Sequence, residues 1–161
     1  MSLPGTESQE GTEMIPGRLW LGGLRAALDE NFLQKNNITV VFNCTKDIPF
    51  SPVVPMQYRV PIDDNLEEEE INNLLKWSPE AVFKLMREYN SGKNILIHCM
   101  AGMQRSAAVC HMFLMTLWRQ KKEPIYAFMR EKRPIVYRPS MNFQKSVEWY
   151  ETWLHTNILK T

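Results

Sequence analysis

The feature that most constrains this chain is a strand, a seven-residue turn and a helix in direct succession between residues 95 and 109. These residues read ILIHCMAGMQRSAAV, and the apolar run before Cys99 predicts a buried strand that ends at this cysteine. From Ser106 to Gln120 the chain is apolar on nearly every side, which predicts a buried helix. Ligand sites in such sheets lie at the carboxyl ends of strands, and helix amino termini attract anions. The order therefore predicts an anion site at the turn.

The turn itself has the residue types that an anion site needs. Gly102 permits a positive φ angle, so that successive backbone N–H groups can point inward around a phosphate. Arg105 can bind two phosphate oxygens with its planar guanidinium and stabilise charge in a transition state. The predicted phosphate-binding residues are Met100, Ala101, Gly102, Met103, Gln104 and Arg105.

The predicted nucleophile is Cys99. A cysteine at a helix amino terminus beside a cation has a lowered pKa and reacts as a thiolate near neutral pH. Ser106 is one residue beyond the turn, where its hydroxyl can reach the sulfur and help it leave an intermediate. We assign the preceding His98 to orienting the turn. A buried strand cysteine is more often only a small apolar residue, but here the strand, Gly102, Arg105, Ser106 and helix occur in the order that the chemistry requires.

The rest of the chain predicts one α/β domain. We expect residues 1–13 to form a loose tail and residues 14–161 to form a single domain with a central, largely parallel sheet of about five strands flanked by helices. The expected strands cover residues 19–23, 38–44, 56–62 and 94–99. The expected helices cover residues 27–35, 66–89 (two helices, or one kinked at Ser78-Pro79), 106–120, 124–133 and from about 140 onward.

Composition limits the partners and the compartment. The net charge of +1 implies neither nucleic acid nor a membrane surface as partner. The amino terminus lacks the basic start and apolar run of a signal peptide, and no apolar stretch is long enough to span a bilayer. The three cysteines have neither metal-ligand spacing nor a disulfide framework. We therefore expect a cytoplasmic or nuclear protein.

The turn resembles the signature of the protein-tyrosine-phosphatase superfamily, which is His-Cys, five residues, Arg, then Ser or Thr. The closer resemblance is to the dual-specificity phosphatases, and it covers about residues 15–151. The segments that carry it are IPGRLWLGGLRAA, ITVVFNCT, VPIDDN, RSAAVCHMFLM and REKRPIVYRPSMNFQKSVEWYE.

The resemblance implies a small single-domain phosphatase that needs no cofactor and no metal. Its expected partner is a phosphorylated protein, from which it removes phosphate at phosphotyrosine and at phosphoserine or phosphothreonine through a phosphocysteine intermediate. Three departures bear on substrate preference. Gln104 replaces a frequent Ser, residues 139–143 read PSMNF where the family has Pro-Asn-x-Gly-Phe, and Ser146 replaces a common Gln.

The general acid has two candidates, Asp63 and Asp64. A carboxyl group on a mobile loop over the pocket is needed to protonate the leaving group. The family pattern has the acid directly before an Asn, which favours Asp64 because Asn65 follows it. In the implied mechanism Cys99 attacks phosphorus while Asp64 protonates the leaving oxygen, and ionised Asp64 then activates the water that releases phosphate.

Other interpretations stay open. A catalytically weak phosphoprotein-binding module would keep the same fold. An RNA 5′-triphosphate or phosphoinositide phosphatase would favour extra Lys or Arg in the turn, where this chain has only Arg105. Cys44 can be a plain buried cysteine, which we favour, or a partner for reversible disulfide formation with Cys99. The preference among phosphorylated residues and the oligomeric state stay open too.

Overall fold

The computed structural model describes residues 10–161, and a five-stranded sheet lies at its centre. The strands lie in the order β1-β2-β5-β3-β4. Only β1 and β2 pair antiparallel, and the other neighbours pair parallel. This arrangement confirms the predicted α/β fold with a largely parallel sheet. The strands are β1 (Thr12–Ile15), β2 (Leu19–Gly22), β3 (Ile38–Asn43), β4 (Met56–Arg59) and β5 (Asn94–His98).

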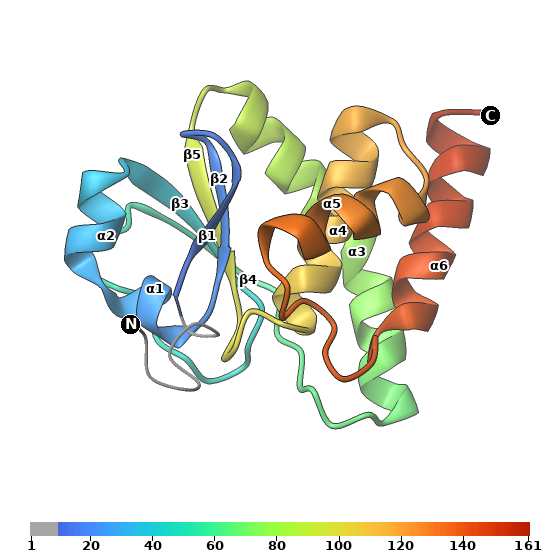
Figure 1. Ribbon diagram of the computed structural model, residues 1–161, viewed down its shortest axis with the longest axis horizontal. Helices are drawn as coiled ribbons and strands as arrows, with labels where there is room; N and C mark the ends of the chain where they lie inside the picture. The colour runs from blue at the N-terminus through green and yellow to red at the C-terminus, as the bar shows by residue number, and fades with distance from the viewer. Residues whose placement is uncertain (1–9) are drawn as a thin grey trace.

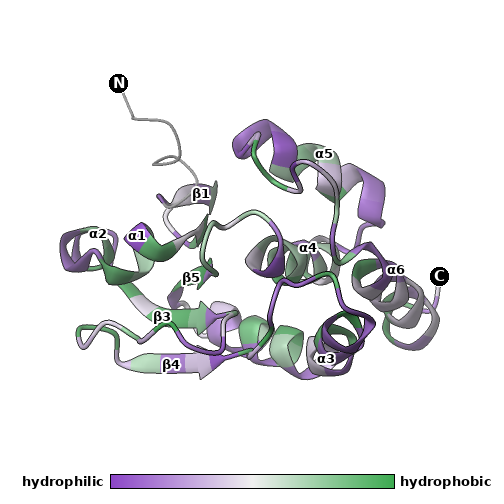
Figure 2. Ribbon diagram, turned by 90° about the horizontal axis from the view of Figure 1, so that it is seen from below, coloured by the Kyte–Doolittle hydropathy of each residue, from purple (hydrophilic) through white to green (hydrophobic). Residues whose placement is uncertain are grey.

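Helices cover both faces of the sheet, α1 and α2 on one side and α3 to α6 on the other (Figure 1). Successive side chains of a strand point to opposite faces, so Ile95 and Ile97 belong to the larger core and Leu96 to the smaller one. In Figure 2, β3 is mostly apolar, whereas outward turns of α2 and α5 are hydrophilic. The helices are α1 (Leu24–Leu28), α2 (Glu30–Lys35), α3 (Glu68–Asn90), α4 (Arg105–Trp118), α5 (Lys122–Lys132), α6 (Gln144–Trp153) and a last turn of π type, η2 (Leu154–Ile158).

The helix predicted over residues 27–35 is two short helices instead. Asp29 interrupts it with extended backbone angles, φ −87° and ψ 96°. Its carboxylate accepts a hydrogen bond from the Phe32 backbone N–H at 3.1 Å. An aspartate that caps a new helix in this way stabilises the break.

The segment around Pro79 is one continuous helix, α3, of 23 residues. Proline has no N–H, so the carbonyl four residues earlier, at Leu75, loses its helical partner. The Ser78 hydroxyl donates to that carbonyl at 2.8 Å and replaces the missing bond. Neither α3 nor another helix within residues 10–161 is both long and apolar enough to cross a membrane.

Several boundaries differ from the prediction; for example, β4 ends at Arg59 rather than at residue 62, and α5 begins at Lys122 rather than at Pro124. Thr12 and Glu13, assigned to the tail, belong to β1 and pair with Leu21 and Trp20 of β2, while residues 1–9 of the predicted tail lie outside the described part of the chain. The last helix begins at Gln144 rather than near Ser140, because the residues before it form a loop against the turn that follows β5.

Candidate active site

Three loops meet at the carboxyl edge of the sheet, at the lower edge of Figure 1. They follow β4, β5 and α5, and they enclose a pocket of about 330 Å³. The parallel direction of β3, β4 and β5 accounts for the meeting of the first two loops, because it places their carboxyl ends at one edge. The pocket is lined by Asp64, Cys99, Met100, Ala101, Met103, Gln104, Arg105, Arg138 and Asn142.

The turn from β5 to α4 depends on Gly102. Its φ angle is +67°, in the left-handed region. A Cβ atom at this position would lie 2.6 Å from the backbone carbonyl of Gly22 and 2.7 Å from the guanidinium of Arg133. Both the backbone angle and the space therefore require glycine.

Cys99 lies at the base of the pocket and is only 2% exposed. Burial by itself raises the pKa of its thiol, but three groups outweigh it: the Arg105 charge, the Ser106 hydroxyl and backbone N–H groups of Ser106 and Gly102. The sulfur is 3.0 Å from the hydroxyl oxygen of Ser106. The pKa of Cys99 is lowered as a result, as a thiolate nucleophile requires.

Arg105 begins α4 and reaches across to the loop after β4. One terminal nitrogen donates to the carbonyl oxygen of Ile62 at 2.9 Å. Its Nε is buried and has no hydrogen-bond partner within residues 10–161. The guanidinium is thus anchored at one end and keeps a free donor in the neighbourhood of the sulfur.

The two aspartates after Ile62 have different surroundings. Asp64 lines the pocket, and its Oδ1 accepts a hydrogen bond from the side-chain amide of Asn142 at 2.9 Å. Asp63 pairs instead with Lys46 at 3.1 Å and does not line the pocket. The structure therefore brings Asp64, rather than Asp63, together with Cys99 and the turn.

His98 is the last residue of β5 and is fully buried. Burial lowers its pKa to about 4, so the ring is neutral near pH 7. Its Nδ1 lies 3.2 Å from the carbonyl oxygen of Cys99 and donates to it. The contact is with the backbone of the turn, consistent with an orienting part.

Arg133 supports the turn, and it is not among the site residues that the sequence predicts. It is buried, and its guanidinium donates to the carbonyls of Gly102 at 3.0 Å and Ala101 at 3.1 Å. It also donates to the Thr12 hydroxyl at 2.7 Å. In the sequence it is one of four charged residues in REKR, and only the fold distinguishes it from its exposed neighbours.

Gln104 connects the turn to the loop that precedes α6. Its amide nitrogen donates to the carbonyls of Arg138 at 3.1 Å and Ser140 at 2.7 Å. Its amide oxygen accepts the backbone N–H of Asn142 at 3.0 Å. The residue that departs from the family's frequent Ser thus makes three bonds that fix the two loops together.

The other cysteines are free and buried. Burial, and then the proximity of Cys99, raises the pKa of Cys44 well above its ordinary value. Burial also raises the pKa of Cys110 to about 12. Only Cys99 among the three thiols has a lowered pKa, and disulfide formation with Cys44 stays a hypothesis.

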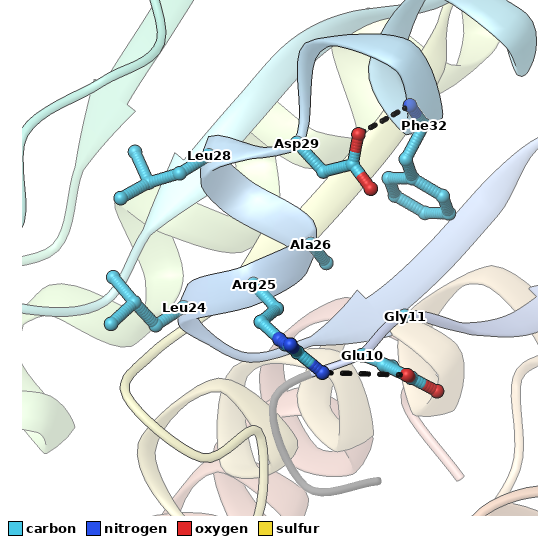
Figure 3. Close-up of a pocket in the computed structure, with 8 residues that line it drawn as sticks. All are labelled: Glu10, Gly11, Leu24, Arg25, Ala26, Leu28, Asp29 and Phe32. Carbon is cyan, nitrogen blue, oxygen red and sulfur yellow. Dashed lines mark hydrogen bonds and ion pairs between the residues drawn. The ribbon is translucent and has the colours of Figure 1, made fainter. Parts of the chain in front are cut away.

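A larger pocket, of about 670 Å³, lies beside α1 and α2 (Figure 3). Its charged side chains include Arg25 and Glu10, which form an ion pair at 3.9 Å. No cysteine or serine lines it. One of its lining residues, Leu24, donates its backbone N–H to the Met100 carbonyl at 2.8 Å. Because none of its lining residues is a predicted catalytic residue, we place the chemistry in the smaller pocket.

Comparisons with known proteins point to one family. Residues 19–152 match the family model described as dual specificity phosphatase, catalytic domain. Human dual specificity protein phosphatase 16 is 30% identical over 87% of this chain, which corresponds to 20% of that longer protein. The crystal structure of human DUSP28 superposes with a TM-score of 0.78 at 26% identity and covers 90% of this chain and 95% of its own. The crystal structure of a human tyrosine phosphatase-like serine/threonine/tyrosine-interacting protein superposes with a TM-score of 0.76 at 25% identity. It covers 89% of this chain and 97% of its own.

Proposed function

The chain belongs to the dual specificity phosphatase family, and on that premise we propose that it hydrolyses phosphate esters of proteins with Cys99 as nucleophile. The observation that carries the proposal is the position of the Cys99 sulfur, 3.0 Å from the Ser106 hydroxyl, at the base of a pocket that Arg105 and Asp64 also line. The lowered pKa of the thiol agrees with this geometry. A thiolate, a phosphate clamp and a carboxyl group within one pocket are the groups that phosphoryl transfer to sulfur needs.

In the first step, the thiolate of Cys99 forms a bond to phosphorus as the bond from phosphorus to the leaving oxygen breaks. Protonated Asp64 donates its proton to that oxygen, so the leaving group departs as a neutral alcohol or phenol. Arg105 and the backbone N–H groups of residues 100–105 bind the phosphoryl oxygens, whose charge grows in the transition state.

In the second step, Asp64 accepts a proton from water as the water oxygen attacks phosphorus. The bond from phosphorus to sulfur breaks, and Cys99 leaves as a thiolate that Ser106 stabilises with its hydroxyl. The products are inorganic phosphate and the starting enzyme with Asp64 protonated. His98 and Arg133 hold the turn in shape and take no part in proton transfer.

The proposed substrate is a phosphoprotein carrying phosphotyrosine, phosphoserine or phosphothreonine. The turn contributes Met100, Ala101 and Met103 to the pocket, and the cations in the lining are Arg105 and Arg138. So few cations suit one phosphoryl group on a protein side chain better than a highly anionic RNA end or inositol lipid. Three free thiols suit a reducing compartment, so we propose a cytoplasmic or nuclear site of action, which fractionation of the tagged protein would test.

The experiment that tests the activity is turnover of 4-nitrophenyl phosphate by wild type and Cys99→Ser, with EDTA and a reductant present. Activity that persists in EDTA and disappears in the variant supports the proposal. A folded wild type with no turnover contradicts it. That second result would favour a phosphoprotein-binding module, which a peptide-binding measurement with phosphotyrosine and unphosphorylated peptides would then identify.

A further inference from the structure

A chain of hydrogen bonds joins the loop of the proposed acid to the phosphate-binding turn. It runs from Asp64 through the side-chain amide of Asn142, at 2.9 Å. It continues from the backbone N–H of Asn142 to the amide oxygen of Gln104, at 3.0 Å. Asn142 is thus the one residue of this chain of bonds that contacts both loops.

Asn142 and Gln104 both depart from the family pattern described above. The family has Gly where this chain has Asn142, and often Ser where this chain has Gln104. The backbone of Asn142 is not in the left-handed region, so this position does not require glycine. What the departure adds is a side-chain amide, and that amide is bonded to Asp64.

We propose that Asn142 is a positioning residue for Asp64, held in place by Gln104. The inference rests on the proposed function, in which Asp64 is the acid of the first step and the base of the second. The side-chain amide of Asn142 donates to Asp64, and it acts by fixing the carboxyl group over the pocket.

The contact has two physical consequences. Asp64 is exposed on the loop after β4, so without a partner its side chain would sample several rotamers and leave the attack geometry in most of them. Because Oδ1 already accepts the Asn142 N–H, the proton of the acid is favoured on Oδ2. The contact therefore selects both a position for the carboxyl group and the oxygen that delivers the proton.

Gln104 holds Asn142 in a fixed position. It is 6% exposed, and its amide nitrogen is occupied by the carbonyls of Arg138 and Ser140. Its oxygen is therefore held in the orientation that accepts the Asn142 N–H. Through Asn142 and Gln104, the position of Asp64 is fixed relative to the proposed phosphate-binding turn.

The test compares two aryl phosphates, phenyl phosphate and 4-nitrophenyl phosphate. The poor phenol leaving group depends on protonation by Asp64, and the more acidic nitrophenol depends on it much less. We expect Asn142→Ala to lower kcat/KM for phenyl phosphate, which reports the first step, by about tenfold, the size of one hydrogen bond. For 4-nitrophenyl phosphate we expect kcat/KM to fall by no more than about twofold, because its leaving group needs little protonation in the first step.

Two further variants sharpen the comparison. Asn142→Asp keeps the size and the backbone N–H but replaces the donor with a second carboxylate, so its loss on phenyl phosphate should equal or exceed that of Asn142→Ala. In an Asp64→Asn background, Asn142→Ala should have no further effect on phenyl phosphate, because a positioning residue acts only through the group it positions. Asn157→Ala is the control, since Asn157 is exposed and donates only to the Trp153 carbonyl within the described chain.

Equal losses of kcat/KM on both substrates would overturn the inference, as would losses of kcat/KM that add in the double variant. A readout without turnover separates the contact from the proposed function. The side-chain amide resonance of Asn142 should titrate with Asp64 in NMR spectra and stop doing so in Asp64→Asn. An inactive wild type whose amide still titrates would overturn the proposed function and leave the contact standing. An amide that does not titrate overturns the inference in either case.

Discussion

The sulfur of Cys99 and the hydroxyl oxygen of Ser106 lie 3.0 Å apart, across the junction between the turn and α4. Both residues are buried, so the hydroxyl is one of the few polar groups available to the thiolate. In the proposed mechanism this contact serves twice, once to ionise the nucleophile and once to let it leave phosphorus.

Ser106→Ala should therefore raise the pKa of Cys99, because one of the groups that lower it is removed. The measurement is the rate of inactivation by iodoacetate as a function of pH, which follows the thiolate. We expect the midpoint to move to higher pH, and the burst of 4-nitrophenol to become larger relative to the steady rate. Ser91→Ala is the control, since Ser91 is exposed and its hydroxyl donates to the Arg87 carbonyl of its own helix. An unchanged midpoint would show that the contact does not act on the sulfur.

Gly102→Ala should abolish phosphate binding at the turn. A Cβ atom would approach the Gly22 carbonyl to 2.6 Å in a backbone conformation that alanine disfavours. The matched control is Gly92→Ala, which has a φ of +84° but nothing within 4 Å of the added Cβ. We expect both variants to lose about 1 kcal/mol from backbone strain, and Gly102→Ala alone to lose inhibition by inorganic phosphate. Equal phosphate inhibition in both variants would contradict the close approach.

Arg133→Met should destabilise the fold and the turn together. It leaves the buried carbonyl of Gly102 and the partly buried carbonyl of Ala101 without their guanidinium donors. Each unsatisfied buried acceptor costs about 1–3 kcal/mol, so we expect a loss of about 3 kcal/mol in the free energy of unfolding. Arg25→Met removes an exposed arginine and should cost less than about 1 kcal/mol. Similar losses for the two variants in urea unfolding would contradict the supporting part assigned to Arg133.

The stability of the fold should fall as pH is lowered from 7 to 5. Burial lowers the pKa of His111 to about 4, while its unfolded value is near 6.5, so the unfolded chain binds the proton first. Stability is therefore complete above about pH 6.5 and is lost on acidification, by about 2 kcal/mol at pH 5 for this histidine. Burial also lowers the pKa of His98 to about 4, so its contribution to stability is lost on acidification as well.

His111→Gln isolates this contribution. His111 contacts the Tyr137 hydroxyl and the Lys122 carbonyl, each at 2.9 Å, and the carbonyl can only accept, so the neutral ring donates from Nε2. The variant should be less stable at pH 7 but should lose about 2 kcal/mol less than wild type between pH 7 and pH 5. An unchanged pH dependence in urea unfolding would contradict a neutral buried His111.

The sequence predicts the sheet and the turn well because both depend on local patterns. Apolar runs set β3 and β5, and the order of Cys99, Gly102 and Arg105 sets the turn. It predicts less where the backbone geometry of a helix decides the outcome. The Asp29 break and the Ser78 bond at Pro79 are local in sequence, but only backbone geometry reveals them.

The candidate site divides in the same way. Cys99 and Arg105 are separated by a fixed short spacing, so their meeting follows from the turn alone. Arg133 and Asn142 come from residues far along the chain, and no periodic pattern distinguishes them from neighbouring polar residues. The roles of Cys99, Arg105, Ser106 and Asp64 stay proposals until the chemistry is measured.

The most direct test of the central proposal is to trap the phosphorylated enzyme. Asp64→Ala would be mixed with 4-nitrophenyl phosphate, quenched in acid within milliseconds and digested for mass spectrometry, because loss of the base slows release of phosphate from sulfur. The proposal predicts one phosphoryl group on the peptide that contains Cys99, and none in Cys99→Ser. Turnover of the substrate by wild type without phosphate on Cys99 in the trapped sample, or phosphate on another residue, would contradict it.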